Sequence, residues 1–171
     1  GQTTTHSYNT AGNRISTKDA LNKTTGFDYD ALNRLTQTTD ALGGISQYDY
    51  NSQDQLTSVS DPNGNATDYT YDDLGNLLQL DSPDTGITIY SYDKAGNVIS
   101  QTDAKGNTTT YQYDALNRLV LITYQDSTTT SYSYDTGTNA IGRLSSVTDP
   151  TGTIQWTYDA FGSVTQKQQV T

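Results

Sequence analysis

The sequence predicts an all-β protein: an antiparallel β-hairpin meander of about eight 21-residue repeats, in a single-layer sheet that curls into a spiral or partial shell. Three observations lead to this prediction. Tyrosines recur at a spacing of 21, a ring stands two residues before each, and turn-forming residues follow at fixed offsets. The repeats are centred on Tyr8, Tyr29, Tyr50, Tyr71, Tyr92, Tyr113, Tyr134 and Tyr158.

The first strand of each repeat contains two rings. The rings that precede the key tyrosines are those of His6, Phe27, Tyr48, Tyr69, Tyr90, Tyr111, Tyr132 and Trp156. Because side chains alternate between the faces of a strand, both rings of a repeat share one face. We therefore expect ladders of aromatic rings, in which each ring contact contributes about 1 kcal/mol beyond its area burial.

A turn is expected directly after each key tyrosine. An Asp at its start can accept hydrogen bonds from backbone N–H groups ahead of it. The candidates are Asp30, Asp72, Asp93, Asp114, Asp135 and Asp159, with Asn9 and Asn51 as variants. Residues that tolerate positive φ follow, as a turn with a bulge requires. They are Gly12, Asn33, Asp54, Gly75, Gly96, Asn117 and Gly162. An aliphatic residue about six positions after the tyrosine then returns to the sheet, and we take it to be Ile15 in the first repeat.

A second turn of the pattern D-x-x-G closes each repeat, most clearly at Asp61–Gly64, Asp103–Gly106 and Asp149–Gly152. Two turns per repeat leave two strands of about 5–7 residues, hence about sixteen strands, and no segment has helical spacing. A β-propeller is an alternative, because two repeats approach the length of one blade. A hairpin solenoid like the choline-binding modules is another.

The composition argues against a thick aliphatic core. Hydrophobic residues make up 32%, the mean hydropathy is -0.72, and there are 14 tyrosines. The net charge of -10 disfavours nucleic acid as a partner, and no stretch is apolar enough to insert into a membrane. Cysteine and methionine are absent and the chain opens with Gly1. We therefore expect residues 1–171 to be one repeat region excerpted from a longer chain, whose remaining parts are its first partners.

No catalytic, cofactor or metal residues are predicted. Asp28 with Asp30, and Asp72 with Asp73, are close in sequence, but a residue that recurs in every repeat fits a turn better than catalysis. His6 holds a ring position and lacks a second histidine or a cysteine to work with. The turn Asp61–Asn65 offers oxygen atoms to calcium without the full EF-hand pattern, so turn formation is the preferred interpretation.

Three segments break the repeat and are therefore better candidates for special roles. Thr136–Gly142 contains extra residues, and Asp81–Gly86 is a widened turn. Leu119–Tyr124 is strongly apolar, and the turn Gln125–Thr128 after it lacks glycine. Tolerated length variation explains the loops, and burial against another coil or subunit explains the apolar strand.

The pattern Y-D-x-x-G-R/N-L/V, followed by D-P-x-G at a period near 21, resembles the YD repeat of the Rhs family. It stands at Tyr71–Leu77 and Tyr92–Val98, and with Asn for Gly in the identical segments Tyr29–Leu35 and Tyr113–Leu119. The family includes Rhs polymorphic toxins, cocoon components of Tc toxin complexes and teneurins. The resemblance implies a sheet that spirals into a hollow shell around an effector, in a secreted or cell-surface protein of bacterial origin. The family's self-cleavage motif is absent, because Asp149–Gly152 is in register as a repeat turn.

The first functional hypothesis is therefore a structural wall segment of such a shell, which encapsulates a toxin or effector and has no enzymatic activity of its own. The alternative is a cell-surface module that uses exposed tyrosines or loops to bind carbohydrate. Because a strip of hairpins has two unpaired edges, we also expect self-association through those edges or through the Leu119–Tyr124 face.

Overall fold

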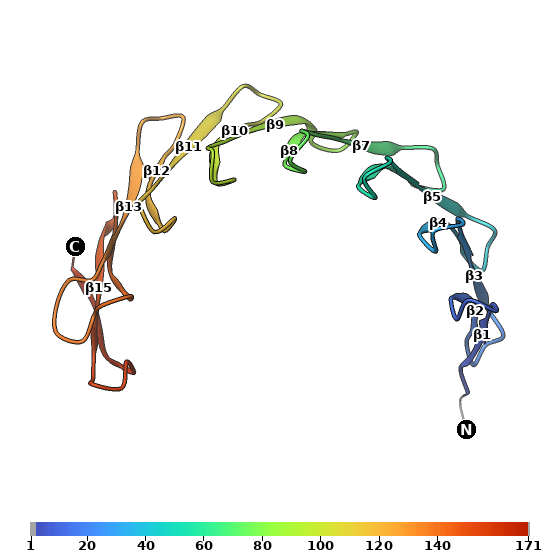
Figure 1. Ribbon diagram of the computed structural model, residues 1–171, viewed down its shortest axis with the longest axis horizontal. Coiled ribbons are helices and arrows are strands. Elements are labelled where there is room, and N and C mark those ends of the chain that lie inside the picture. The colour runs from blue at the N-terminus through green and yellow to red at the C-terminus, as the bar shows by residue number, and fades with distance from the viewer. Residues whose placement is uncertain (1–2, 171) are drawn as a thin grey trace. The chain divides into compact units, whose positions relative to one another are not determined.

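The computed structural model describes residues 3–170, and in them the chain forms one antiparallel meander. Sixteen strands follow one another in chain order, β1 through β16, joined by short turns except for a longer loop between β13 and β14 (Figure 1). The prediction of an all-β hairpin meander is confirmed. A propeller is excluded, because a propeller would divide these strands into separate four-stranded blades. No helix in the described residues is both long and apolar enough to cross a membrane.

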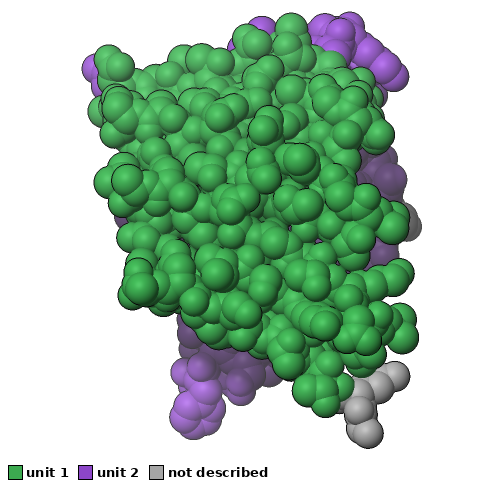
Figure 2. Space-filling view, turned by 90° about the vertical axis from the view of Figure 1, so that its right-hand side faces the viewer, with its two compact units in different colours: residues 1–87 green, residues 88–171 purple. Residues whose placement is uncertain are grey.

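The chain divides into two compact units, Gly1–Ile87 and Thr88–Thr171, coloured separately in Figure 2. The strands of the first unit are β1 (Thr5–Tyr8), β2 (Arg14–Lys18), β3 (Thr24–Tyr29), β4 (Leu35–Thr39), β5 (Ile45–Tyr50), β6 (Leu56–Ser60), β7 (Ala66–Tyr71) and β8 (Leu77–Ser82). β9 (Gly86–Tyr92) begins just before the boundary. The second unit continues with β10 (Val98–Thr102), β11 (Thr108–Tyr113), β12 (Leu119–Thr123), β13 (Thr129–Tyr134), β14 (Leu144–Asp149), β15 (Gly152–Tyr158) and β16 (Val164–Val170).

The register gives the sheet two chemically different faces. Phe27 pairs with Thr38, Tyr48 with Val59, and Tyr111 with Ile122. We call the face that carries these rings and aliphatic side chains the ring face. The residues between the rings belong to the opposite, polar face. Its cross-strand pairs include Asp28–Gln37, Asp49–Ser58, Ser133–Ser146 and Ser146–Gln155.

A bulge on the return strand of each tyrosine-turn hairpin brings the first residue of that strand opposite the key tyrosine, on the ring face. In every hairpin closed by a tyrosine turn the pairing shifts by one residue next to the tyrosine, as between Asp28 and Tyr29. Tyr29 then pairs with Leu35. In the first repeat the corresponding partner of Tyr8 is Arg14, so the assignment of this position to Ile15 was wrong by one residue.

The core is thin, as the composition predicted. Ala140, at 1% exposure, is the buried hydrophobic residue of the described chain, and most ring-face residues are half-buried. The apolar strand β12 is half-buried along its whole length. Stability therefore comes mainly from contacts between neighbouring strands, as in other repeat proteins.

Candidate functional site

The turn after each key tyrosine is built around one aspartate. In the second repeat the Asp30 N–H donates to Arg34 O at 3.0 Å, and Asn33 N–H donates to Asp30 O at 3.0 Å. Asp30 Oδ1 accepts N–H bonds from Leu32 and Arg34, both at 2.9 Å. The side chain thereby satisfies backbone donors that the tight turn leaves outside the strand ladder.

The same turn recurs on both edges of the sheet. On the YD edge, which we define by the turns that follow the key tyrosines, side-chain acceptors at the corresponding position are those of Asn9, Asp30, Asn51, Asp72, Asp93, Asp114 and Asp159. On the opposite edge, the second edge, they include Asp19, Asp40, Asp61 and Asp103.

These hydrogen bonds stabilise the charged carboxylates. The pKa of Asp72 is lowered by bonds from the side chain and backbone of Asn76, and Asn97 lowers that of Asp93 in the same way. The pKa of Asp30 is lowered by the backbone N–H and side chain of Arg34. The lowered pKa values of these carboxylates are thus explained by hydrogen bonds within the turns.

Four residues after the tyrosine, the backbone enters the left-handed region. Asn33 has φ 63°, Asp54 63° and Asn117 59°, and the glycines at Gly12, Gly75, Gly96 and Gly162 have φ between 84° and 90°. Asn, Asp and Gly are the residues that adopt this conformation at little cost. The glycine-free turn Gln125–Thr128 places Ser127 at φ 65°.

Arg34 connects its own turn to the next one on the YD edge. Its Nε lies 2.7 Å from Asp30 Oδ2, and its Nη1 lies 2.7 Å from Asp54 Oδ1 and 3.1 Å from Asn51 O. Its guanidinium also lies 4.8 Å from the ring centre of Tyr50. A single planar cation therefore contacts both turns and the next ring.

Arg118 makes the same connection in the second unit. Its Nε and Nη2 each lie 2.7 Å from a carboxylate oxygen, of Asp114 and Asp135 respectively, and its guanidinium lies 4.4 Å from the Tyr134 ring centre. Bonds from Arg118 and from the Gly142 N–H lower the pKa of Asp135. The pKa of Arg118 is raised in turn, chiefly by its bonds to Asp135 and Asp114.

Neighbouring turns on this edge are joined by a regular row of contacts. The residue before the return strand of one repeat reaches the positive-φ residue of the next. Where that residue is Asn or Asp, a side-chain bond forms, as in Asn13–Asn33 at 2.6 Å, Arg34–Asp54 at 2.7 Å and Asn97–Asn117 at 2.9 Å. Where the positive-φ residue is glycine, the side chain from the preceding repeat lies against that glycine, as in Gln55–Gly75 and Arg143–Gly162. We call this series the edge row.

The key tyrosines join repeats a second time through their hydroxyl groups. A hydroxyl donates to the backbone carbonyl at the start of the preceding return strand. The pairs are Tyr29–Arg14 at 3.0 Å, Tyr113–Val98 at 3.0 Å, Tyr134–Leu119 at 3.0 Å and Tyr158–Leu144 at 2.7 Å. At Tyr134 and Tyr158 the joint thus combines a contact between arginine and ring, a hydroxyl bond and a contact of the edge row.

The Arg34 and Arg118 contacts were not predicted, although the sequence contained a signal for them. The identical segments Tyr29–Leu35 and Tyr113–Leu119 keep an arginine, and the next YD-edge turn contains an aspartate partner in each case, Asp54 four residues after its key tyrosine and Asp135 directly after its own. This coincidence of opposite charges indicates a contact between repeats.

The extra residues Thr136–Gly142 change the seventh turn. Asp135 Oδ1 accepts a single backbone bond, from Gly142 N–H at 2.6 Å. In the other turns the two donors stand two and four residues after the aspartate, whereas the insertion places this donor seven residues after it. Ser145, which is nearly buried, accepts a bond from the Thr136 N–H at 2.8 Å.

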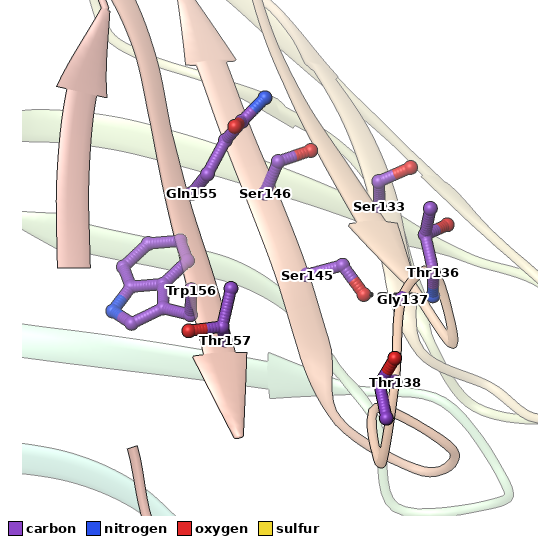
Figure 3. Close-up of a pocket in the computed structure, with 9 residues that line it drawn as sticks. All are labelled: Ser133, Thr136, Gly137, Thr138, Ser145, Ser146, Gln155, Trp156 and Thr157. Carbon is purple, nitrogen blue, oxygen red and sulfur yellow. Dashed lines mark hydrogen bonds between the residues drawn. The ribbon is translucent and has the colours of Figure 1, made fainter. Parts of the chain in front are cut away.

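This loop and the polar face enclose a cavity of about 230 Å³. Ser133, Thr136–Thr138, Ser145, Ser146 and Gln155–Thr157 line it (Figure 3). Strand alternation places the Trp156 ring on the opposite face from Gln155. The lining contains hydroxyl, amide and backbone groups without any charged side chain. It therefore lacks an acid–base pair for catalysis.

The other chemical candidates lie apart or are engaged in turns. His6 Nδ1 lies 3.1 Å from Thr17 Oγ1 in an exposed position. Asp28 accepts a bond from Gln37 while Asp30 is bonded within its turn. Both carboxylate oxygens of Asp61 accept bonds inside the turn that was considered for calcium. Residues 3–170 contain no group of three or more His or Asp side chains that could hold a metal ion.

A sheet of near-identical hairpins joined in this manner defines a tandem β-hairpin repeat protein. The RHS Repeat family model matches residues 8–45, 50–87, 92–127 and 139–169, and the chain therefore belongs to the RHS repeat family. A search of curated protein sequences gave no match.

A solved structure shares the fold. The crystal structure of TcdB2-TccC3 without its hypervariable C-terminal region aligns with 98% of this chain at a TM-score of 0.74 and 19% identity. The present chain spans 10% of that chain's length. TcdB2-TccC3-Cdc42 aligns over 97% of this chain and 12% of its own at a TM-score of 0.42 and 17% identity. A Tc holotoxin pore of Photorhabdus luminescens gives the same coverage and identity at 0.41.

Proposed function

We propose that this chain is a wall segment of a hollow β-shell in a longer Rhs/YD-type protein, and that the shell encloses a toxin or effector domain. The observation that carries the proposal is the construction of the joints. Each hairpin pairs with its sequence neighbours in one sheet, and tyrosine hydroxyls and edge-row contacts reinforce several of these joints, so the sheet can be extended repeat by repeat. Membership of the RHS repeat family supports the same reading.

The two faces suit a wall between different surroundings. The ring face carries half-buried tyrosines and aliphatic side chains, whereas the polar face carries mainly Ser, Thr, Gln and Asp, with Ile45, Ile89 and Leu121 among them. A single-layer sheet with such faces separates two compartments without needing a second layer of its own. This property supports a wall more than a binding module, for which one face would be sufficient.

We also propose that the segment has no catalytic activity. Its recurring aspartates are engaged by turn N–H groups, and a carboxylate held with a lowered pKa is a poor proton donor near neutral pH. Location outside the cell is proposed on family membership alone.

Self-association through the outer strands β1 and β16 remains proposed, and the turns of the YD edge offer a second contact surface. Apolar side chains stand exposed at the tips of the YD-edge turns, among them Leu74 at 86% and Phe161 at 93% exposure. Contact between two such edges would remove these side chains from water, at roughly 25 cal/mol per Å² of apolar area. Sedimentation of the wild type and of Leu74→Ser under the same conditions compares their self-association and so measures the contribution of this side chain.

Paired single-cysteine variants test the wall. The chain contains no cysteine, so one introduced thiol is the only site for maleimide labelling in this segment. Ser46→Cys places a thiol on the ring face and Gln47→Cys places one on the polar face of the same strand. Each variant is labelled with a polyethylene-glycol maleimide, both in the isolated segment and in the longer chain that contains it.

In the isolated segment both thiols should react, whereas in the longer chain one face should be protected until the protein is denatured. Equal labelling of both faces in the longer chain would contradict the wall. Limited proteolysis of the same longer chain then asks whether the sequence outside the repeats is protected when the shell is intact.

A further inference from the structure

One turn of the second edge contains a pair of residues that is chemically reactive. The turn between β6 and β7 reads Asp61-Pro62-Asn63-Gly64. Of the chain's twelve asparagines, Asn63 alone is followed directly by glycine. Because glycine has no side chain to shield its own backbone nitrogen, that nitrogen can approach the side-chain carboxamide of the preceding asparagine.

Both residues of this pair are exposed, and Gly64 has open space around it. Apart from its chain neighbours, no atom lies within 4 Å of the position that a Cβ of Gly64 would take. The φ of Gly64 is 84°, and its N–H donates to Asp61 O at 3.0 Å. This single backbone bond has to open before the nitrogen can react. Exposed turns open locally at a much lower free energy than the whole sheet unfolds.

Asparagines near the end of these turns are held more firmly than Asn63. Asn65 Nδ2 donates to Asp61 Oδ2, and Asn107 Nδ2 donates to Asp103 Oδ2, both at 2.8 Å. Each of these two asparagines is followed directly by a strand, β7 and β11 respectively. The Asn63 side chain makes the smallest of the contributions that lower the pKa of Asp61. Within this turn, the carboxamide of Asn63 is therefore less restrained than that of Asn65.

We propose that Asn63 is a site of spontaneous modification, at which the folded chain converts a neutral side chain into a carboxylate. The Gly64 nitrogen loses its proton to solvent and forms a bond to Asn63 Cγ. The bond from Cγ to Nδ2 breaks, and the leaving group takes up a proton and departs as ammonia. Water then opens the resulting succinimide ring at either of its two carbonyl groups. One product has aspartate at position 63, and the other has isoaspartate, in which the backbone runs through the side-chain carbon.

The two products affect the turn differently. In the aspartate product the backbone is unchanged, and a second carboxylate joins that of Asp61. In the isoaspartate product an additional carbon enters the backbone between the Asn63 N–H, which donates to Asp61 Oδ1 at 2.8 Å, and the Gly64 N–H. The hydrogen bonds that close the turn then no longer fit. Pro62 lies beside Gly44 of the preceding second-edge turn, so the isoaspartate product loosens the β6–β7 hairpin and this contact together.

This inference goes beyond the wall function and does not depend on it. To test it, the whole segment is incubated in mildly alkaline buffer, in which circular dichroism verifies that it stays folded, and is analysed by mass spectrometry over time. The mass gain of an amide that becomes an acid should appear at Asn63 before it appears at any other asparagine. Electron-transfer fragmentation should show isoaspartate beside aspartate. The rate should rise with pH, because the nitrogen attacks in its deprotonated form.

Other second-edge turns of the chain supply the control variants. Asn63→Lys installs the residue that another of these turns has at the same place, Lys105, and should abolish the mass gain at this turn. Gly64→Asn installs the residue found at the corresponding positive-φ position of the first such turn, Asn22 with φ 62°. This variant should react more slowly than the wild type, because a side chain then shields the attacking nitrogen. Thermal melting verifies the folding of both variants.

The stability of the products gives a second measurement. Asn63→Asp corresponds to the aspartate product and should melt close to the wild type, whereas the isolated isoaspartate fraction should melt at a lower temperature. The site is refuted if the folded segment gains no mass, if another asparagine reacts first, or if Gly64→Asn reacts as fast as the wild type. An isoaspartate fraction as stable as Asn63→Asp would overturn the predicted effect on the hairpin.

Discussion

Replacing Tyr134 by Phe should measure the strength of one joint between repeats. The hydroxyl of Tyr134 donates to Leu119 O at 3.0 Å, and its ring lies under Arg118. Phenylalanine keeps the ring contact and removes only the hydrogen bond. The net value of such a bond is about 1 kcal/mol, so the free energy of unfolding should fall by about that amount. For a cooperative unit of roughly 60–100 residues this corresponds to a melting temperature lower by about 4–8 °C.

Tyr132→Phe is the matched control, because Tyr132 lies two residues away on the same strand and face and its hydroxyl has no partner among residues 3–170. Urea unfolding followed by circular dichroism gives both free energies, and hydrogen exchange localises the loss to β12–β14. The triple variant with Tyr113→Phe and Tyr158→Phe should lose about 3 kcal/mol, because the three bonds have separate acceptors. Equal stability of Tyr134→Phe and Tyr132→Phe would refute the hydroxyl joint.

Three further predictions concern the turns and the charges. Asn117→Ala should be about 1 kcal/mol less stable than Asn117→Gly in urea unfolding, because both lose the bond from Asn97 but only alanine is strained at φ 59°. Arg118→Lys should lower the melting temperature, since an ammonium group lacks the planar fork that reaches both carboxylates. In a double-mutant cycle it should also abolish the coupling energy between this position and Asp135. An undiminished coupling energy would count against the bridge. The melting temperature should fall on the acid side as pH drops below the ordinary aspartate pKa of 3.8 and through the lowered pKa values of the folded state. It should also fall on the alkaline side as pH rises above the ordinary tyrosine pKa of 10.0, because burial raises the tyrosine pKa in the folded state. A melting temperature that does not change at acid pH would show that the turn carboxylates do not contribute. The carboxylates concerned include Asp72, Asp93 and Asp114, and the tyrosines Tyr71, Tyr111, Tyr113 and Tyr132.

The sequence was sufficient to predict the meander because every repeat supplies its own local signals. Asn33 and Asn117 have the positive φ that their place in the pattern requires, and the strands begin and end close to the expected turns. The one misplaced return residue, Ile15, arose because Arg14 occupies a position where other repeats have an aliphatic side chain. Local periodicity does not distinguish an arginine packed on Phe27 from one in solvent.

The joints between repeats were harder to predict because their partners lie far apart in sequence. The tyrosine hydroxyl bonds span 14 or 15 residues, and the edge row spans 17–20. Such contacts depend on strand register, which is set by bulges that no single residue type marks.

All nineteen acidic side chains of this chain are aspartates, and the turn geometry explains the choice for most of them. Twelve of them accept a backbone N–H bond from their own turn, and glutamate, with one more methylene group, would overshoot that donor. The isoelectric point of about 4.1 is therefore a by-product of folding rather than a sign of a cationic ligand. Because every added hairpin brings further turn carboxylates, mutual repulsion between such sheets grows with their length. A chain of this kind gains colloidal solubility in proportion to the number of its turns.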